Sequence, residues 1–258
     1  MTLGTDKWRV WGAEAEYGNV FYKRATAELP EMESSKAVTK HLAGLAKADD
    51  LILDVGCGAG HYLRSLLNGL PTPFAYHGVD ATANYIALAK EAWQGVESDK
   101  LLSAQFQQGD IFNIDLKDAY ADVVMCNNVL LHLPSVEQPI KELVRVSKKY
   151  TVIRALIGDN SFRIKQVMEP EEYDQAGDPV NFFYYNIYSE SYIRAVLDRI
   201  PEIKSVRFIS DHDYDPANLV SSISDYAETP KDITKIMNGL QVNNYIIQPW
   251  MFVIVEKA

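Results

Sequence analysis

The sequence is poor in cysteine, with only Cys57 and Cys126 among its 258 residues. Two thiols cannot form the disulfide framework of a small secreted domain, and their spacing matches no zinc-binding pattern. Cys57 lies between two glycines, and Cys126 ends an apolar run. Both are therefore predicted to be buried thiols that pack as small hydrophobic side chains.

Positively charged residues are also few compared with negatively charged ones. Lys and Arg number 25 against 35 Asp and Glu, so the formal net charge is -10 and the isoelectric point lies near 5.0. Proteins that bind nucleic acid through its phosphates need clustered Lys and Arg, and no basic run occurs here. We expect no nucleic-acid partner.

Long apolar stretches are absent as well. No span of about 20 apolar residues occurs, which is the length that a membrane-spanning helix needs. Met1–Gly12 also lacks the charged and apolar regions of a secretory signal. We expect no membrane partner and a cytoplasmic location.

The most informative stretch reads LILDVGCGAG at residues 51–60, an apolar run with one acid followed by alternating glycines. A short apolar run bounded by glycine predicts a buried parallel strand, and the amphipathic stretch His61–Asn68 predicts a helix after it. Glycine is needed in such a turn because positive φ and the close approach of a ligand both exclude a Cβ. The free N–H groups of the helix N-terminus favour a polar ligand there.

The spacing of the glycines separates two kinds of cofactor site. Dinucleotide enzymes carry G-x-G-x-x-G, whereas here the third glycine, Gly60, comes one residue early. Asp54 followed by Gly56-x-Gly58-x-Gly60 resembles motif I of the class I S-adenosylmethionine-dependent methyltransferases. In that family the glycine turn surrounds the amino-acid part of the cofactor. A nicotinamide-dependent oxidoreductase and a glycine-rich turn without a ligand are the alternatives.

Two acids follow in the order that this resemblance implies. The predicted strand Phe74–Val79 ends at Asp80, where a carboxylate can accept hydrogen bonds from both ribose hydroxyls of a nucleoside. Gly109-Asp110-Ile111 follows the predicted strand Leu101–Gln108 and resembles the family motif in which the acid contacts the adenine. The family's pattern gives these candidate cofactor-binding residues for S-adenosyl-L-methionine: Tyr22, Asp54, Gly56, Cys57, Gly58, Gly60, Asp80, Ala81, Tyr85, Asp110, Ile111 and Asn127.

A fourth predicted strand, Ala121–Cys126, leads into Asn127–Pro134, which resembles the family's segment with leucine, histidine and proline. His132 is the candidate catalytic residue, because a histidine ordinarily titrates in the range that suits a general base for a hydroxyl acceptor. A role in holding the loop is the alternative. The two asparagines stand where magnesium-dependent relatives carry aspartates, so we predict no metal. Ser135 is the predicted N-cap of the next helix.

The elements together predict an α/β fold: a doubly wound, seven-stranded, mostly parallel sheet, Rossmann-like as in methyltransferases, with N-terminal helices and a cap insertion. We expect a helical lid at 1–50, a cofactor-binding core at 51–157, and cap insertions with the final strands at 158–258. Asp6–Leu29 is helix-compatible, and Ser34 is the predicted N-cap of a second helix.

Two segments exceed a minimal core, Gly158–Tyr188 and Asp211–Gln248. The first follows the fifth predicted strand, at the edge of the sheet where ligands bind, so we predict that it forms much of the acceptor pocket. Its aromatic and acidic side chains suit a cationic or sugar-like acceptor. The alternative is that the rings pack the insertion onto the domain and the acidic side chains are solvated. Asp211–Asp215 has the residue types of a metal-ligand cluster, but adjacent residues of an extended chain point to opposite sides, so His212 could not easily share a metal with either neighbour. We therefore predict a solvated loop.

Methyl transfer from a sulfonium is a direct displacement, so alignment and the exclusion of water matter more than acid–base chemistry. The sequence therefore predicts an enzyme that methylates an O or N atom of a small-molecule acceptor. The alternatives are a nicotinamide-dependent oxidoreductase, a non-catalytic binding protein that keeps the nucleoside pocket, and a methyltransferase acting on a protein. The sequence sets no expectation for the oligomeric state.

Overall fold

The central sheet has the strand order β3-β2-β1-β4-β5-β13-β9, and a short strand, β8, pairs with β5. The computed structural model describes residues 15–212, 235–237, 240–243 and 246–258. The strands of this sheet are β1 (Asp50–Val55), β2 (Phe74–Asp80), β3 (Leu101–Gln108), β4 (Ala121–Asn127), β5 (Ser147–Gly158), β8 (Tyr188–Ser189), β9 (Ile203–Ser210) and β13 (Trp250–Lys257). All neighbouring pairs are parallel except those of β13, which runs antiparallel to both β5 and β9. The predicted mostly parallel sheet is confirmed.

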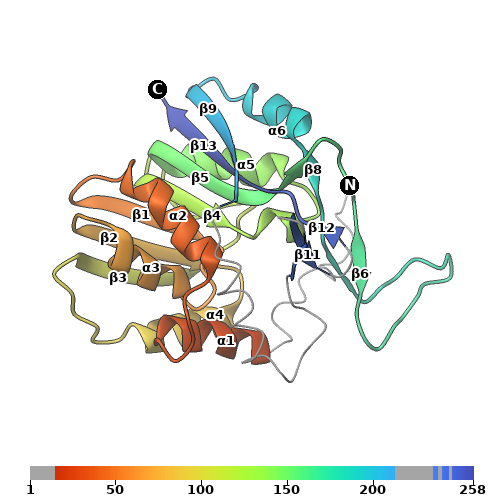
Figure 1. Cartoon of the computed structure of the whole chain (residues 1–258), viewed down its shortest axis with the longest axis horizontal. Helices are drawn as coiled ribbons and strands as arrows, with labels where there is room; N and C mark the ends of the chain where they lie inside the picture. Colours follow the sequence, from red (N-terminus) through yellow and green to blue (C-terminus); the bar gives the residue numbers. More distant parts are fainter. Residues whose placement is uncertain (1–14, 213–234, 238–239, 244–245) are drawn as a thin grey trace.

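Helices cover both faces of the sheet (Figure 1). They are α1 (Ala15–Ala25), α2 (Glu33–Ala43), α3 (His61–Gly69), α4 (Ala83–Ala92), α5 (Glu137–Val146) and α6 (Glu190–Leu197). One apolar core joins the sheet to α5 and α6, and the other joins it to α2, α3 and α4. In β1, Leu53 belongs to the first core and Ile52 to the second, so the strand is buried on both sides as its apolar run predicts. None of the described helices is long and apolar enough to cross a membrane.

Two predicted helix starts are wrong. The second helix begins at Glu33 after Met32, because the Ser34 hydroxyl instead lies 2.8 Å from the Tyr62 hydroxyl of α3. A buried tertiary hydrogen bond replaces the local cap that the sequence suggests. The fifth helix begins at Glu137 after Val136, one residue later than a Ser135 cap would place it. A short 3-10 helix, η2 (Leu130–His132), comes before it.

The insertion between β5 and β8 forms a two-stranded hairpin, β6 (Lys165–Val167) with β7 (Phe182–Tyr184). Figure 1 shows its connecting loop reaching away from the main sheet. The second predicted insertion is described only in part, with a small sheet of β10 (Lys235–Met237), β11 (Leu240–Asn243) and β12 (Ile246–Ile247). Most of the 211–248 prediction lies outside the described residues, as does the predicted lid before Ala15.

Candidate cofactor and acceptor site

The glycine turn after β1 has the backbone that its sequence predicts. Gly56 has φ of 83° and Gly58 has φ of 55°, both in the left-handed region that favours glycine. A Cβ on Gly56 would lie 2.2 Å from Cγ2 of Val129 in the loop after β4. Cys57, between the two glycines, is buried as expected. The turn is thus packed closely beneath the β4 loop, directly before the N-terminus of α3.

Asp80 links this turn to the end of β2. Its carboxylate accepts hydrogen bonds from the backbone N–H of Gly58 at 2.9 Å and of Thr82 at 2.8 Å. Burial raises the pKa of Asp80 above its ordinary value, and these two donors act against that rise. Ala81 follows on the surface, and its carbonyl accepts a hydrogen bond from Gln108 at 2.9 Å.

Asp54 is the most deeply buried acid of the turn, with 2% of its surface exposed. Its carboxylate accepts a hydrogen bond of 2.7 Å from the Tyr76 hydroxyl on β2. Burial raises the pKa of Asp54 to about 7; the charge of Asp80 adds to the rise and the Tyr76 hydrogen bond opposes it. This acid is therefore partly protonated near neutral pH.

The segment after β3 lies beside these acids. Gly109 donates its N–H to the Asp80 carbonyl at 3.0 Å, which holds the ends of β2 and β3 together. Asp110 accepts the Phe112 N–H at 2.9 Å in a local turn, and Ile111 is buried. The strand ends carrying Asp54, Asp80 and Asp110 meet at one edge of the sheet, as the predicted site requires.

Asn127 ends β4 at the same edge and is 6% exposed. Neither its amide nitrogen nor its amide oxygen has a hydrogen-bond partner among the described residues. Buried polar atoms in folded proteins are almost always hydrogen-bonded, so this amide indicates where a polar ligand is missing. With the Gly56 turn, which leaves no room for a Cβ, this buried amide suits a polar ligand that lies against bare backbone.

Helix α1 covers the glycine turn through Phe21 rather than Tyr22. The Phe21 ring stacks on His61 with centroids 4.4 Å apart and planes 2° apart, and it meets Tyr85 edge-on at 5.8 Å. Tyr22 instead donates its hydroxyl to Glu91 of α4 at 3.2 Å. Burial lowers the pKa of His61 to about 3, so its ring is neutral under Phe21. Phe21 and Tyr22 are adjacent in the sequence, which does not tell which of them turns inward.

His132 lies in η2 and contacts the insertion. Its Nδ1 is 2.9 Å from the Tyr184 carbonyl, which can only accept, so Nδ1 carries the hydrogen. Burial lowers the pKa of His132 to about 4. The expectation that His132 titrates near neutral pH is therefore wrong, because the insertion removes water from a ring that the sequence alone leaves exposed. The rings of Phe183 and Tyr185 lie 6.1 and 6.2 Å from it.

The prediction of a solvated loop is wrong for Asp211. Its side chain is only 3% exposed, and its carboxylate pairs with the Arg154 guanidinium at 2.6 and 2.7 Å. Arg154, on β5, also donates to the Asn128 side chain at 2.5 Å and lies 4.0 Å from the centre of the Trp250 ring. His212 is exposed, and residues 213–215 lie outside the described residues. The sequence carries no local signal for this pair, whose members are 57 positions apart.

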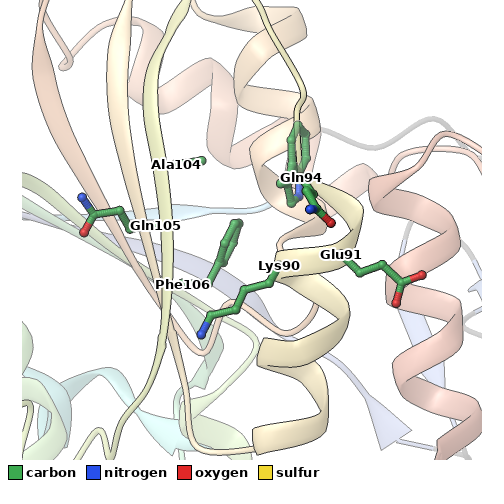
Figure 2. Close-up of a pocket in the computed structure, with 7 residues that line it drawn as sticks. Lys90, Glu91, Gln94, Ala104, Gln105 and Phe106 are labelled. Carbon is green, nitrogen blue, oxygen red and sulfur yellow. The ribbon is translucent and has the colours of Figure 1, made fainter.

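A groove of about 680 Å³ lies between α4 and β3 and includes none of the residues around Arg154 and Asp211. Figure 2 shows Lys90 and Glu91 of α4 beside it, with Phe106 of β3. A Cβ on Gly60 would lie 2.8 Å from Phe106, so the back of the groove is formed by a ring that also packs on the glycine turn. Among the described residues no group of three or more His, Cys, Asp or Glu could hold a metal ion.

A parallel sheet with helices on both faces and a glycine turn at the end of β1 is the arrangement of α/β domains that bind nucleoside-containing cofactors. Residues 53–153 match the family model of the methyltransferase domain. Residues 53–153 of this chain therefore form a methyltransferase domain.

Relatives and solved structures agree with this assignment. The chain is 26% identical over 201 residues to sterol 24-C-methyltransferase of Eremothecium gossypii, covering 78% of this chain and 48% of that protein. It is 29% identical over 102 residues to demethylmenaquinone methyltransferase of Lactobacillus johnsonii, covering 40% of this chain and 41% of that protein. The chain spans about half the length of the curated relatives it matches.

Structural likeness extends beyond the matched segment. Phosphoethanolamine N-methyltransferase 2 of Haemonchus contortus, solved with S-adenosyl-L-methionine, has a TM-score of 0.64 at 14% identity. The likeness covers 98% of this chain and 60% of that one. At this identity the comparison establishes the fold.

Proposed function

We propose that this protein transfers the methyl group of S-adenosyl-L-methionine to an O or N atom of a small molecule by direct displacement. The observation that carries the proposal is the edge of the sheet where the Gly56 turn, Asp80 and the unpartnered Asn127 amide come together. Bare backbone, a carboxylate and a buried amide form a cradle that suits the polar groups of an amino-acid nucleoside.

Each predicted residue receives a role in this proposal. The N–H groups of the Gly56–Gly60 turn and the Asn127 amide hold the amino-acid end of the cofactor, beside the buried Asp54 and Cys57. Asp80 accepts from the ribose hydroxyls, since each carboxylate oxygen can take a further donor besides the backbone N–H that it now accepts. Asp110 and the Ile111 N–H hold the adenine. Tyr85 and Ala81 line the same side of the site.

Helix α1 excludes water from this cradle. Phe21 lies over the turn, since a Cβ on Gly58 would be 3.1 Å from its ring, and Tyr22 fastens the helix to Glu91. Bound S-adenosyl-L-methionine supplies an electrophilic methyl group, so the protein's own task is to align the acceptor and keep the site dry.

His132 acts on the acceptor side in this proposal. With a pKa of about 4, its ring is neutral at physiological pH, and its Nδ1–H is held by the Tyr184 carbonyl. In this tautomer Nε2 carries the lone pair, so it can accept a hydrogen bond from an acceptor hydroxyl. Such a ring orients the hydroxyl more effectively than it removes its proton, because a base of low pKa binds a proton weakly.

A small-molecule acceptor is supported by the names of the relatives, which act on a sterol and on a demethylated menaquinone. The sterol methyltransferase, whose likeness covers 78% of this chain, is named for a carbon acceptor. Carbon methylation of a small molecule is therefore a second candidate. A protein acceptor is a further outcome that an acceptor screen would reveal.

The decisive experiment measures the binding of S-adenosylhomocysteine by calorimetry and then follows its formation from S-adenosyl-L-methionine with panels of phenols, amines, sterols and quinols. Asp80→Asn should weaken binding about tenfold or more, because hydrogen bonds to a charged group contribute about 1.5–3 kcal/mol. Asp122→Asn is the matched control, since Asp122 pairs with Lys149 at the opposite edge of the sheet. A wild-type protein that binds NAD but not S-adenosylhomocysteine, or equal affinities for both variants, would overturn the proposal.

A further inference from the structure

We propose that Asp211, held in place by Arg154, positions the methyl acceptor by accepting a hydrogen bond from one of its hydroxyl or amino groups. The inference rests on the proposed methyl transfer and extends it to the chemistry of the acceptor. Its acceptor is a molecule with an apolar body and at least one hydrogen-bond donor.

The topology places Asp211 at the edge of the sheet that carries the cofactor cradle. Strands β5 and β9 are both antiparallel to β13, so they are parallel to each other and their carboxyl ends share one edge. Asp211 directly follows β9 and donates its N–H to the Trp250 carbonyl at 2.8 Å. Asn127, at the carboxyl end of β4, lies in register with Arg154 on β5. Arg154 reaches across β13 to pair with Asp211, so Asn127, Arg154 and Asp211 form a polar row at this edge of the sheet.

Both ends of this row carry buried polar atoms that lack a partner. One carboxylate oxygen of Asp211, Oδ2, accepts both hydrogen bonds from Arg154, at 2.7 Å from Nε and 2.6 Å from Nη2. The other oxygen, Oδ1, is buried and has no hydrogen-bond partner among the described residues. The Asn127 amide, on the other side of Arg154, is also buried and has no hydrogen-bond partner among the described residues. A buried carboxylate oxygen without a donor is unfavourable, so this position calls for a donor that the described residues do not supply, and the proposal assigns it to the methyl acceptor.

The charges around Asp211 indicate which kind of chemical group the donor is. Arg154 and Asp211 neutralise each other, and the remaining Arg154 nitrogen donates to Asn128. A neutral pair has no net charge left for a carboxylate or phosphate on the acceptor. A hydroxyl or amino group fits, because it donates to Oδ1 without adding an unpaired charge.

Trp250 supplies the apolar side of the proposed subsite. Its ring lies over the Arg154 guanidinium at 4.0 Å and packs against the apolar cluster of Leu131, Leu156 and Ile187. An acceptor whose donor group reaches Asp211 would rest its hydrocarbon part on the partly buried Trp250 ring, which this buried cluster supports from behind. Arg154 itself acts through Asp211 and is a positioning residue.

The test uses the substitution Asp211→Asn in the full-length protein. Asparagine keeps an oxygen for Arg154 and presents an NH2 donor where Oδ1 lies, so the polarity of the subsite is inverted while its shape is kept. The probes are p-cresol, which carries a donor, and 4-methylanisole, which lacks one. Their binding to protein saturated with S-adenosylhomocysteine is measured by ligand-observed NMR. Wild type should prefer p-cresol, and the variant should lose about tenfold of that affinity while binding of 4-methylanisole stays constant.

Asp122→Asn is again the control, because it removes a carboxylate at the opposite edge and should leave both affinities unchanged. Equal binding of p-cresol to wild type and Asp211→Asn, or no preference between the probes in wild type, overturns the inference. The wild-type preference provides a test that does not depend on how well the variant folds. If wild type fails to bind S-adenosylhomocysteine, the proposed function fails and this inference with it. If that binding is intact and only the probe preference is absent, the acceptor inference alone fails.

Discussion

Asp54 makes the stability of this protein depend on pH in a direction opposite to that of most carboxylates. It is 2% exposed, and burial raises its pKa from 3.8 to about 7. The folded state therefore holds a proton that the unfolded chain releases at lower pH. The contribution of Asp54 to stability is therefore highest below about pH 4, falls as pH rises towards about 7, and levels off above that value.

The size of this effect follows from the two pKa values. The interval from 3.8 to about 7 corresponds to about 4 kcal/mol at most, because one pKa unit is worth about 1.4 kcal/mol. Asp54→Asn removes the ionisation and keeps a side-chain oxygen to accept the hydrogen bond of Tyr76. The stability of the variant relative to wild type should therefore increase by about 3 kcal/mol between about pH 5 and about pH 8.

Urea unfolding followed by circular dichroism at several pH values across this window measures the difference directly. Asp122→Asn provides the matched control. Lys149 and the Leu51 N–H lower the pKa of Asp122, against the opposing effect of its partial burial, so it is ionised in both states above about pH 5. The difference between this control and wild type should be independent of pH. A constant difference between Asp54→Asn and wild type would refute the reasoning, since it would mean that Asp54 ionises normally in the folded state.

Three further outcomes are expected. Tyr76→Phe removes the hydroxyl that lowers the pKa of Asp54. In the same urea-unfolding measurements the stability of this variant should therefore keep falling to a higher pH than that of wild type. Gly56→Ala should lower the melting temperature strongly, because its Cβ would lie 2.2 Å from Val129. Adding Val129→Ala should recover the part due to the clash and leave about 1–2 kcal/mol of backbone strain. His132→Gln should lower turnover. The pH–rate profile of wild type should show no limb near pH 6–7 from His132, because its pKa is about 4. A limb in that range that is present in wild type and absent from the variant would contradict this low pKa.

Much of the cofactor side could be predicted from the sequence because its signals are local. The run 51–60 determines a buried strand and a glycine turn by burial on both faces and by backbone conformations that other residues avoid. Asp80 and Asp110 follow predicted strands, and parallel strands bring their carboxyl ends to one edge. Residues far apart in the sequence therefore meet without any further specification, and the structure brings these strand ends together as expected.

The choice between neighbouring aromatic residues could not be made in this way. Phe21 and Tyr22 are adjacent aromatic residues of α1, yet only Phe21 stacks on His61 while Tyr22 reaches Glu91. Ser34 likewise suits a helix cap but bonds to Tyr62. In both cases the local preferences for the alternative arrangements differ by little, so a contact with another helix decides which arrangement is adopted.

The sequence by itself determined the sheet, the glycine turn and the acids at the strand ends, because periodicity and backbone requirements act over a few residues. Only the tertiary structure decided that His132 is a ring with a low pKa and that Asp211 is a buried partner of Arg154. The reason is that pKa values and ion pairs depend on which distant segments exclude water from a side chain. That exclusion is produced by the insertion after β5 and by the meeting of β5, β9 and β13.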